Sequence, residues 1–180
     1  MSEGRGTSQP FLWIGAPFFT NEKLIEILSE IKKSKPQYVD EKYIKIEVDD
    51  GKEDGVTTPI SIKGVVTHPK YENEKCVGFH FKLNLRQIFE DMKDEKCSFS
   101  SLRLVVLLMC FLKREFEKEI KFYPFLDSLW GNEDLRFLFS KINKDTETRE
   151  IVERFESLFQ SVDDELKCFE KLRKKYSLYS

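Results

Sequence analysis

The stretch LRLVVLLMCFLKREFEKEI, residues 102–120, decides the fold because it changes character halfway along. All residues from 104–112 are apolar, whereas beyond Lys113 only Phe116 and Ile120 continue the helical spacing. This pattern predicts a helix that is wrapped in protein at one end and half solvated at the other. The apolar run would cover about 14 Å of helix, far less than the roughly 30 Å that a bilayer requires. We therefore expect the core of a soluble domain and no membrane span.

The predicted helix has two apolar sides when its residues are placed about 100° apart around the axis. One side carries Leu102, Val105, Val106, Met109, Leu112 and Phe116, and the other carries Leu104, Leu107 and Phe111. Both sides need cover, and the simplest arrangement places the helix between a sheet and further helices. We expect an α+β fold, in which a small, mostly antiparallel sheet packs on this central helix and the C-terminal half is helical.

The remaining elements are predicted from apolar spacing and from turn and capping residues. Strands are expected at 11–14, 43–48, 59–66 and 76–83, and helices at about 21–35, 85–92, 122–130, 132–142 and 146–176. The order before the central helix is thus strand, helix, three strands, helix. Residues 1–10 are expected to be loose, and 11–180 to form a single compact domain with a possible division into 11–95 and 98–180.

The composition is that of an ordinary globular protein. The 180 residues are 40% hydrophobic and 34% charged, and 30 basic against 32 acidic residues leave a net charge of −2. No overall field would steer such a chain to nucleic acid or to an anionic membrane. The four cysteines, Cys76, Cys97, Cys110 and Cys168, form no CxxC pair and are expected to be reduced thiols. The N-terminus lacks the form of a signal peptide, so we expect cytoplasm or nucleus.

Catalytic, metal and cofactor motifs are not recognisable. Cys76 and His80 share a strand face, but their backbones should lie roughly 13 Å apart, which is too far for a nucleophile and its base. His68 precedes Pro69 and is expected in a solvated loop. The acidic segment 49–54 departs from the calcium-loop pattern, and we expect a hairpin turn there. We therefore predict no catalytic, metal or cofactor residues and no enzymatic activity.

Two segments resemble the RNA-recognition motif. LWIGAPFFTNEKLIEIL (12–28) is similar to its first strand and helix, and KCVGFHF (75–81) to its RNP1 strand. In that family, aromatic side chains on the open sheet surface stack on bases. The resemblance implies that Trp13, Val77 and Phe79 are such surface residues. The hydrophobic alternation of the second segment instead buries Val77, Phe79, Phe81 and Leu83.

Aromatic and basic clusters supply the candidate binding residues. The helix at 132–142 already has a full apolar face, so Phe137 points away from it. We take Phe125, Trp130 and Phe137 as anchors for a protein partner, with additional core as the alternative. Near the C-terminus, Lys171, Arg173, Lys174 and Lys175 suit the negative end of a helix and, as an alternative, contact with an anion or nucleic acid.

The resulting hypothesis is a non-enzymatic adaptor subunit of an intracellular complex whose partner is another protein. The alternative is a nucleic-acid-binding protein that uses an RNA-recognition-like sheet or the basic C-terminal helix; nucleic acid is the less favoured partner. The last helix is expected to pack on the body, and a self-associating coil is its alternative. The chain is therefore expected to be a monomer or a homodimer through this helix.

Overall fold

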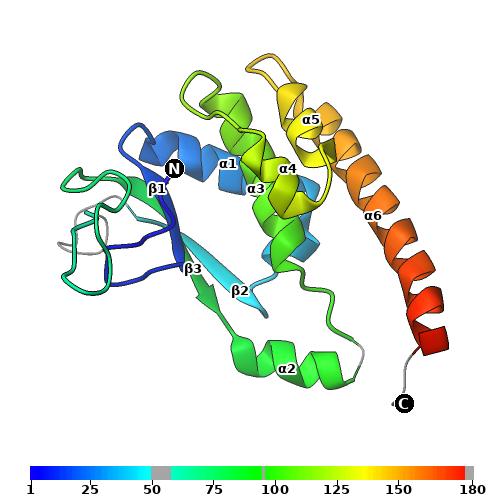
Figure 1. The fold of residues 1–180 in the computed structure, drawn as a ribbon. Helices are drawn as coiled ribbons and strands as arrows, with labels where there is room; N and C mark the ends of the chain where they lie inside the picture. The colour runs from blue at the N-terminus through cyan, green and yellow to red at the C-terminus, as the bar shows by residue number, and fades with distance from the viewer. Residues whose placement is uncertain (50–57, 95, 177–180) are drawn as a thin grey trace.

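The computed structural model describes residues 1–49, 58–94 and 96–176 and has a mixed α+β fold, as predicted (Figure 1). Its elements are β1 (Trp13–Ala16), α1 (Asn21–Ser34), a 3-10 helix η1 (Pro36–Val39), β2 (Ile44–Asp49), β3 (Val77–Leu83), α2 (Leu85–Lys93), α3 (Ser101–Glu115), α4 (Phe125–Trp130), α5 (Asp134–Ser140) and α6 (Thr148–Tyr176). Helix α1 packs on one face of the sheet with α3 and α6 layered beyond it, α2 extends past the end of β3, and the N-terminal segment and the loop before β3 lie on the other side of the sheet. The acidic residues 50–54 fall outside the described part.

The sheet has the order β1-β3-β2, and both neighbours of β3 are antiparallel to it. Phe79 pairs with Ile14 and Phe81 with Ile46, so these side chains share the face that packs on the helices. The expected strand at 59–66 is absent from this sheet and makes only an isolated bridge between Ile62 and Val66. A turn through Gly64, whose φ is +78°, reverses the chain after too few residues to form a strand.

Helix α3 is the centre of the core, as predicted. Ser100 caps it by accepting a hydrogen bond from the Arg103 amide at 3.3 Å. Leu104, Leu107 and Phe111 are buried, and α3 contacts α1, η1 and α6. The second predicted face is only partly covered: Val106, Leu112 and Phe116 are buried, whereas Leu102 and Val105 near the N-terminal end of α3 are exposed.

A buried charge cluster joins α1, α3 and α6. The guanidinium of Arg114 donates to both carboxylate oxygens of Glu30, at 2.7 and 3.1 Å, and to Thr148 Oγ1 at 3.1 Å. Thr148 donates its own hydroxyl to Glu30, and Glu115 accepts from Arg114 Nε at 2.9 Å. The Arg114 side chain is only 9% exposed, so its positive charge is stabilised by ion pairs and hydrogen bonds rather than by water.

Helix α2 has its apolar face turned outward. Leu85, Phe89 and Met92 are exposed, although their spacing suggests a core-facing stripe. The inward contact is polar: Asp91 accepts a hydrogen bond from the Tyr43 hydroxyl at 2.6 Å and pairs with Lys42. Figure 1 shows that α2 stands away from the other helices, so no helical layer covers its apolar side.

Helix α6 packs on the body through its first half only. Ile151, Phe155 and Phe159 are buried, whereas residues 164–176 are exposed and project beyond the body (Figure 1).

Within the described ranges, no helix is both long enough and apolar enough to cross a membrane.

Candidate functional site

The N-terminal segment forms a tight loop on the sheet face opposite the helices. The Ser2 amide donates to the Gly15 carbonyl at 2.7 Å, and the Gly15 amide donates back to Ser2 at 3.0 Å. The Thr7 hydroxyl donates to the Gly4 carbonyl at 2.6 Å and accepts from the Gln9 amide at 3.2 Å. Sequence analysis expected these residues to be loose, yet Ser2 and Thr7 are buried. The loop therefore presents its remaining side chains from a fixed backbone.

Trp13 is buried beneath this loop. Its ring lies so close to Gly15 and Gly78 that a Cβ atom on either would lie 2.1 or 2.7 Å from it. His80 shares this face, and its Nε2 lies 2.8 Å from Gln9 Oε1 of the loop. Trp13 is fully buried, and Phe79 is buried on the opposite face. The RNA-stacking surface that the resemblance implied is therefore wrong, because the two aromatics neither share a face nor reach solvent.

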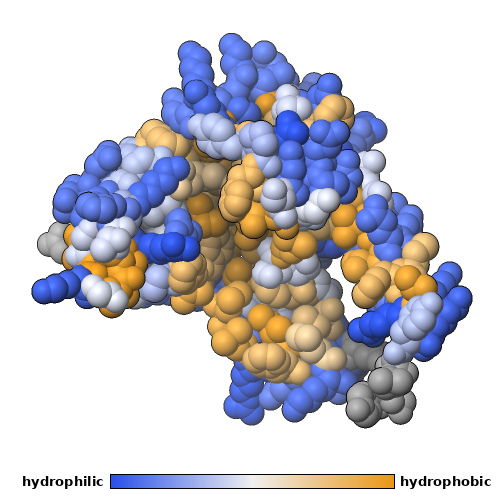
Figure 2. All heavy atoms as spheres, viewed as in Figure 1, coloured by the Kyte–Doolittle hydropathy of each residue, from blue (hydrophilic) through white to orange (hydrophobic). Residues whose placement is uncertain are grey.

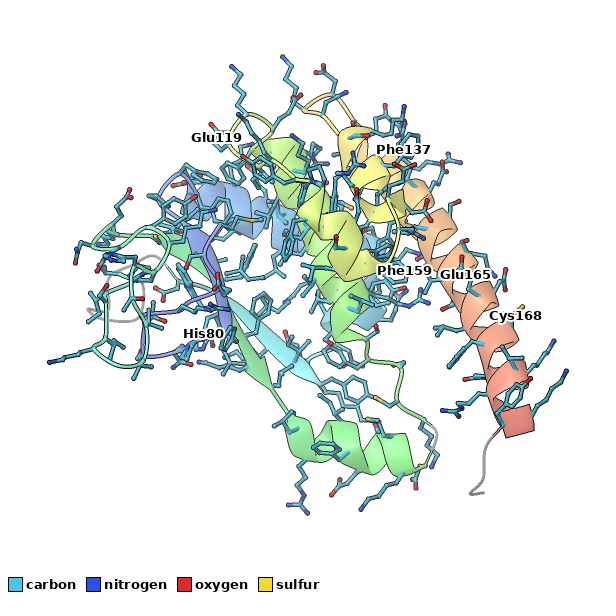
Figure 3. All side chains as sticks on the ribbon, in the orientation of Figure 1. His80, Glu119, Phe137, Phe159, Glu165 and Cys168 are labelled. Atoms are coloured by element: carbon cyan, nitrogen blue, oxygen red, sulfur yellow. The ribbon has the colours of Figure 1, made fainter. Side chains whose placement is uncertain are left out.

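A charged cleft of about 290 Å³ opens beside the loop. Its lining combines Glu3 and Arg5 from the loop with residues 65–70 from the segment before β3, including His68 and Lys70. Figure 3 labels His80 on the same side of the sheet and Phe137 on the far side of the molecule. This cleft brings together loop side chains far apart in the sequence, on a region that backbone hydrogen bonds hold in place.

Arg5 lines the cleft and contacts two other residues of the N-terminal segment. Its Nε atom pairs with Glu3 Oε1 at 2.9 Å, and its guanidinium lies 5.4 Å from the centre of the Phe11 ring. Arg5 and Glu3 are 59% and 47% exposed, so the pair contributes little to stability. The contacts instead orient the fork of the guanidinium, whose terminal nitrogens can receive a carboxylate.

The opposite wall is held in an unusual backbone conformation. His68 has a φ of +51°, and its amide donates to Ser61 Oγ at 3.0 Å. Glu72 accepts from the Ser61 amide at 3.1 Å, and hydrogen bonds from Ser61 and His68 hold its pKa below the usual range of a glutamate. Tyr71 and Asn73 also have positive φ values. Such strained residues concentrate at functional sites.

A second hollow of about 340 Å³ adjoins the cleft and shares Arg5, Val65 and Val66 with it. Phe11 and Ile62 line this hollow, and Phe11 is 68% exposed. A small apolar area is visible on this side of the molecule in Figure 2. Charge on one side and an exposed aromatic ring on the other suit a ligand that has both a polar and an apolar face.

At Gly6 the N-terminal loop comes close to the segment before β3. Its φ is +80°, and a Cβ atom there would lie 2.4 Å from the carbonyl oxygen of Ile60. We expect Gly6→Ala to destabilise the protein by about 2–3 kcal/mol, because it adds a backbone clash to the strain of a positive φ. Gly64 has nearly the same φ, +78°, with no atom near its Cβ position.

Gly64→Ala is therefore the matched control, with an expected loss of about 1 kcal/mol in urea unfolding. Equal losses in the two variants would show that the close approach of the walls at Gly6 is unimportant.

The predicted partner anchors do not lie at this cleft. Phe125 and Phe137 are 71% and 60% exposed, and Phe137 lines a separate groove between α5 and α6 with Lys141 and Arg154. Trp130 is partly buried, and its ring packs edge-on against Phe159 at 6.1 Å. Phe125 and Phe137 are thus free to contact a partner, which stays a prediction, whereas Trp130 also serves the core.

The other candidate groups lack a site. The basic residues Lys171, Arg173, Lys174 and Lys175 are exposed on the projecting end of α6. Burial raises the pKa of the Cys76 thiol to about 11, so this group remains protonated at neutral pH. All four cysteines are free thiols, and the described residues include no group of three acidic, histidine or cysteine side chains that could hold a metal.

The cleft is better suited to hold a ligand than to cleave one. Cleavage reactions that rely on carboxylates usually need two of them, one as the acid and one as the base or nucleophile. Glu3 is the one carboxylate in the lining of the cleft, and it is paired with Arg5. The described side chains therefore provide recognition chemistry here, with at most half of a carboxylate pair.

Comparison with known protein families found a match over nearly the whole chain. The family model described as exo-β-N-acetylmuramidase NamZ, C-terminal, matches residues 1–179. The chain belongs to this family. Comparisons with curated proteins and with solved structures found no match.

The family overturns the functional hypothesis drawn from the sequence. The non-enzymatic adaptor is wrong, because the family is defined as part of an enzyme. The prediction of no enzymatic activity is wrong for the same reason, and the family gives no support to the nucleic-acid alternative. The RNA-recognition-like sheet also lacks its aromatic surface, because Trp13 is buried. Sequence reasoning also missed Glu3, Arg5 and Phe11, whose one signal was a pair of glycines, Gly4 and Gly6, among polar residues.

Proposed function

We propose that this chain is a domain of an exo-β-N-acetylmuramidase-type glycosidase and that its cleft holds the terminal acidic amino sugar. The match over residues 1–179 carries the proposal. The name of the family enzyme specifies N-acetylmuramic acid as the sugar that it releases. This sugar differs from N-acetylglucosamine by a lactyl ether that carries a carboxylate.

The charges of the cleft fit such a ligand. Arg5 has its Nε occupied by Glu3, and the terminal nitrogens of its guanidinium are positioned to donate to a carboxylate in a bidentate manner. Lys70 lines the same cleft and adds a second positive charge. The exposed ring of Phe11 next to Arg5 offers an apolar surface for the C–H face of a pyranose.

The number of carboxylates in the cleft indicates what this chain contributes to hydrolysis. Because Glu3 is the single carboxylate that lines the described cleft, we assign the chain substrate positioning rather than the complete hydrolytic machinery. A group that orients the sugar ring accelerates hydrolysis by holding the scissile bond near the catalytic acid.

The test compares two sugars on the purified chain. We expect N-acetylmuramic acid to perturb the amide NMR signals of residues 3–11 and 65–70, and to bind about tenfold or more tightly than N-acetylglucosamine, which lacks the carboxylate. Arg5→Gln should remove the preference, because it deletes the charged fork while preserving polarity. Lys63→Gln, in the same loop region but outside the cleft lining, is the matched control.

Two results would overturn the proposal. Equal affinity for the two sugars would show that the lactyl carboxylate is not recognised, and perturbation confined to another surface would place the sugar elsewhere. A preference for N-acetylmuramic acid that survives Arg5→Gln would remove Arg5 from its assigned role.

A further inference from the structure

We infer that two copies of this chain pair through the projecting end of α6, residues 162–176, in an antiparallel arrangement. This interaction surface is independent of the cleft proposed above. Two observations carry the inference: an apolar stripe that lacks cover, and a distribution of charge that is complementary to itself when reversed.

The stripe continues the buried face of α6. Residues 18 apart on a helix are five turns apart and point in the same direction. Phe169 therefore points the same way as Ile151, and Tyr176 the same way as Leu158. Ile151 is fully buried and Leu158 packs on the core, but Phe169 is 58% and Tyr176 76% exposed. The face that docks α6 on the body thus runs on beyond the body without cover.

Other apolar side chains border the same space. On α6, Leu166 and Leu172 are 52% and 51% exposed. Across the open side of the molecule, α2 turns its exposed Phe89 and Met92 outward. Figure 2 shows apolar surface on α2 and on the lower half of α6, with a hollow between them. A helix laid on α6 would therefore have apolar surface on more than one side.

The charges identify the occupant as a second copy. If two α6 helices run antiparallel about a two-fold axis at Phe169, Leu166 lies opposite Leu172 and Val162 opposite Tyr176. The same register sets Glu165 opposite Arg173, and both lie within about 40° of Phe169 around the helix, so they face the partner. Two-fold interfaces require a self-complementary surface of this kind.

The charges of this register are available. Among the described residues, no ion pair involves Glu165 or Arg173, and both are exposed. Six other charged residues at this end of α6 point more than about 100° away from Phe169 around the helix and lie outside the pairing surface: Asp163, Asp164, Lys167, Lys171, Lys174 and Lys175.

A charge-swap experiment tests both the pairing and its direction. Sedimentation equilibrium should show concentration-dependent dimers of the unaltered chain. An acidic-to-basic variant, Glu165→Lys, and a basic-to-acidic variant, Arg173→Glu, should each raise the dimer dissociation constant about tenfold or more. An equimolar mixture of the two variants should regain dimers, and so should the chain that carries both changes.

Each outcome has a definite meaning. Phe169→Lys should abolish the dimer and leave the far-UV circular dichroism and unfolding midpoint unchanged, whereas Leu129→Lys, at an exposed residue of α4, should leave the dimer intact. A wild-type chain that stays monomeric at the highest accessible concentration overturns the inference. Dimers that tolerate the acidic-to-basic variant overturn the antiparallel register, and dimers that survive Phe169→Lys place the interface elsewhere.

Discussion

Leu107→Ala is expected to cost about 4 kcal/mol of unfolding free energy. Leu107 is fully buried in the middle of α3, where it packs within the core between the sheet side and the helices. Deleting three buried carbons removes their transfer free energy and leaves a cavity, and such losses span about 2–5 kcal/mol. Urea unfolding followed by circular dichroism measures the change, with the m-value as a check on the two-state assumption.

Leu102→Ala is the control within the same helix. Leu102 is 51% exposed, so the same chemical change should cost less than about 1 kcal/mol. Similar losses in both variants would mean that the two faces of α3 are buried alike, contrary to the structure. Met109 is partly buried, so Met109→Ala should cost an amount of unfolding free energy between these two values.

Arg114→Ala should cost about 3 kcal/mol. The substitution leaves Glu30 without the two guanidinium hydrogen bonds that neutralise it, and removing one partner of a buried pair typically costs 3–5 kcal/mol. The estimate is at the lower end because the Glu30 side chain is 31% exposed and gains some hydration. The double variant Arg114→Met with Glu30→Gln should recover part of the loss, since neither charge is then unpaired.

The same cluster makes stability depend on pH. Burial alone would raise the pKa of Glu30, but hydrogen bonds from Arg114 and Thr148 outweigh burial and lower the pKa below the ordinary 4.5. A carboxylate whose pKa is depressed by folding adds stability above its unfolded pKa and loses that stability as the pH falls through the folded value. Acid titration should therefore destabilise the native chain below about pH 4.5, and Glu30→Gln should weaken this dependence. An unchanged acid profile in Glu30→Gln would contradict the assignment.

The central helix was predictable because its signal is long and local. Nine successive apolar residues, 104–112, leave few alternatives to a buried helix, and Ser100 before them is a capping residue. The β3 register was predictable for a similar reason, since Phe79 and Phe81 alternate with Gly78 and His80. Of the other two residues predicted to be buried with them, Val77 is partly buried and Leu83, at the end of the strand, is exposed. Both predictions rest on neighbours along the chain.

The orientation of α2 and the location of the candidate site depend instead on contacts between residues that are far apart in the sequence. The apolar spacing of α2 resembles a core face, but a hydrogen bond between Asp91 and Tyr43 turns that face outward. Arg5 and His68 line the cleft from separate loops, and no periodic pattern in the sequence predicts that they lie close together. The enzyme family was beyond residue-level reasoning, because no catalytic pair stands out in the sequence.

The ends of the sheet carry a consequence for aggregation. A free strand edge offers unpaired amides and carbonyls to any extended segment, and folded proteins commonly block such edges with a covering segment or with charge. Here Ser2 occupies the edge of β1 through its two hydrogen bonds to Gly15. On the other edge, β2 carries Lys45 and Glu47, which pair at 2.7 Å. Each edge of the described sheet thus carries a feature that disfavours the addition of a foreign strand.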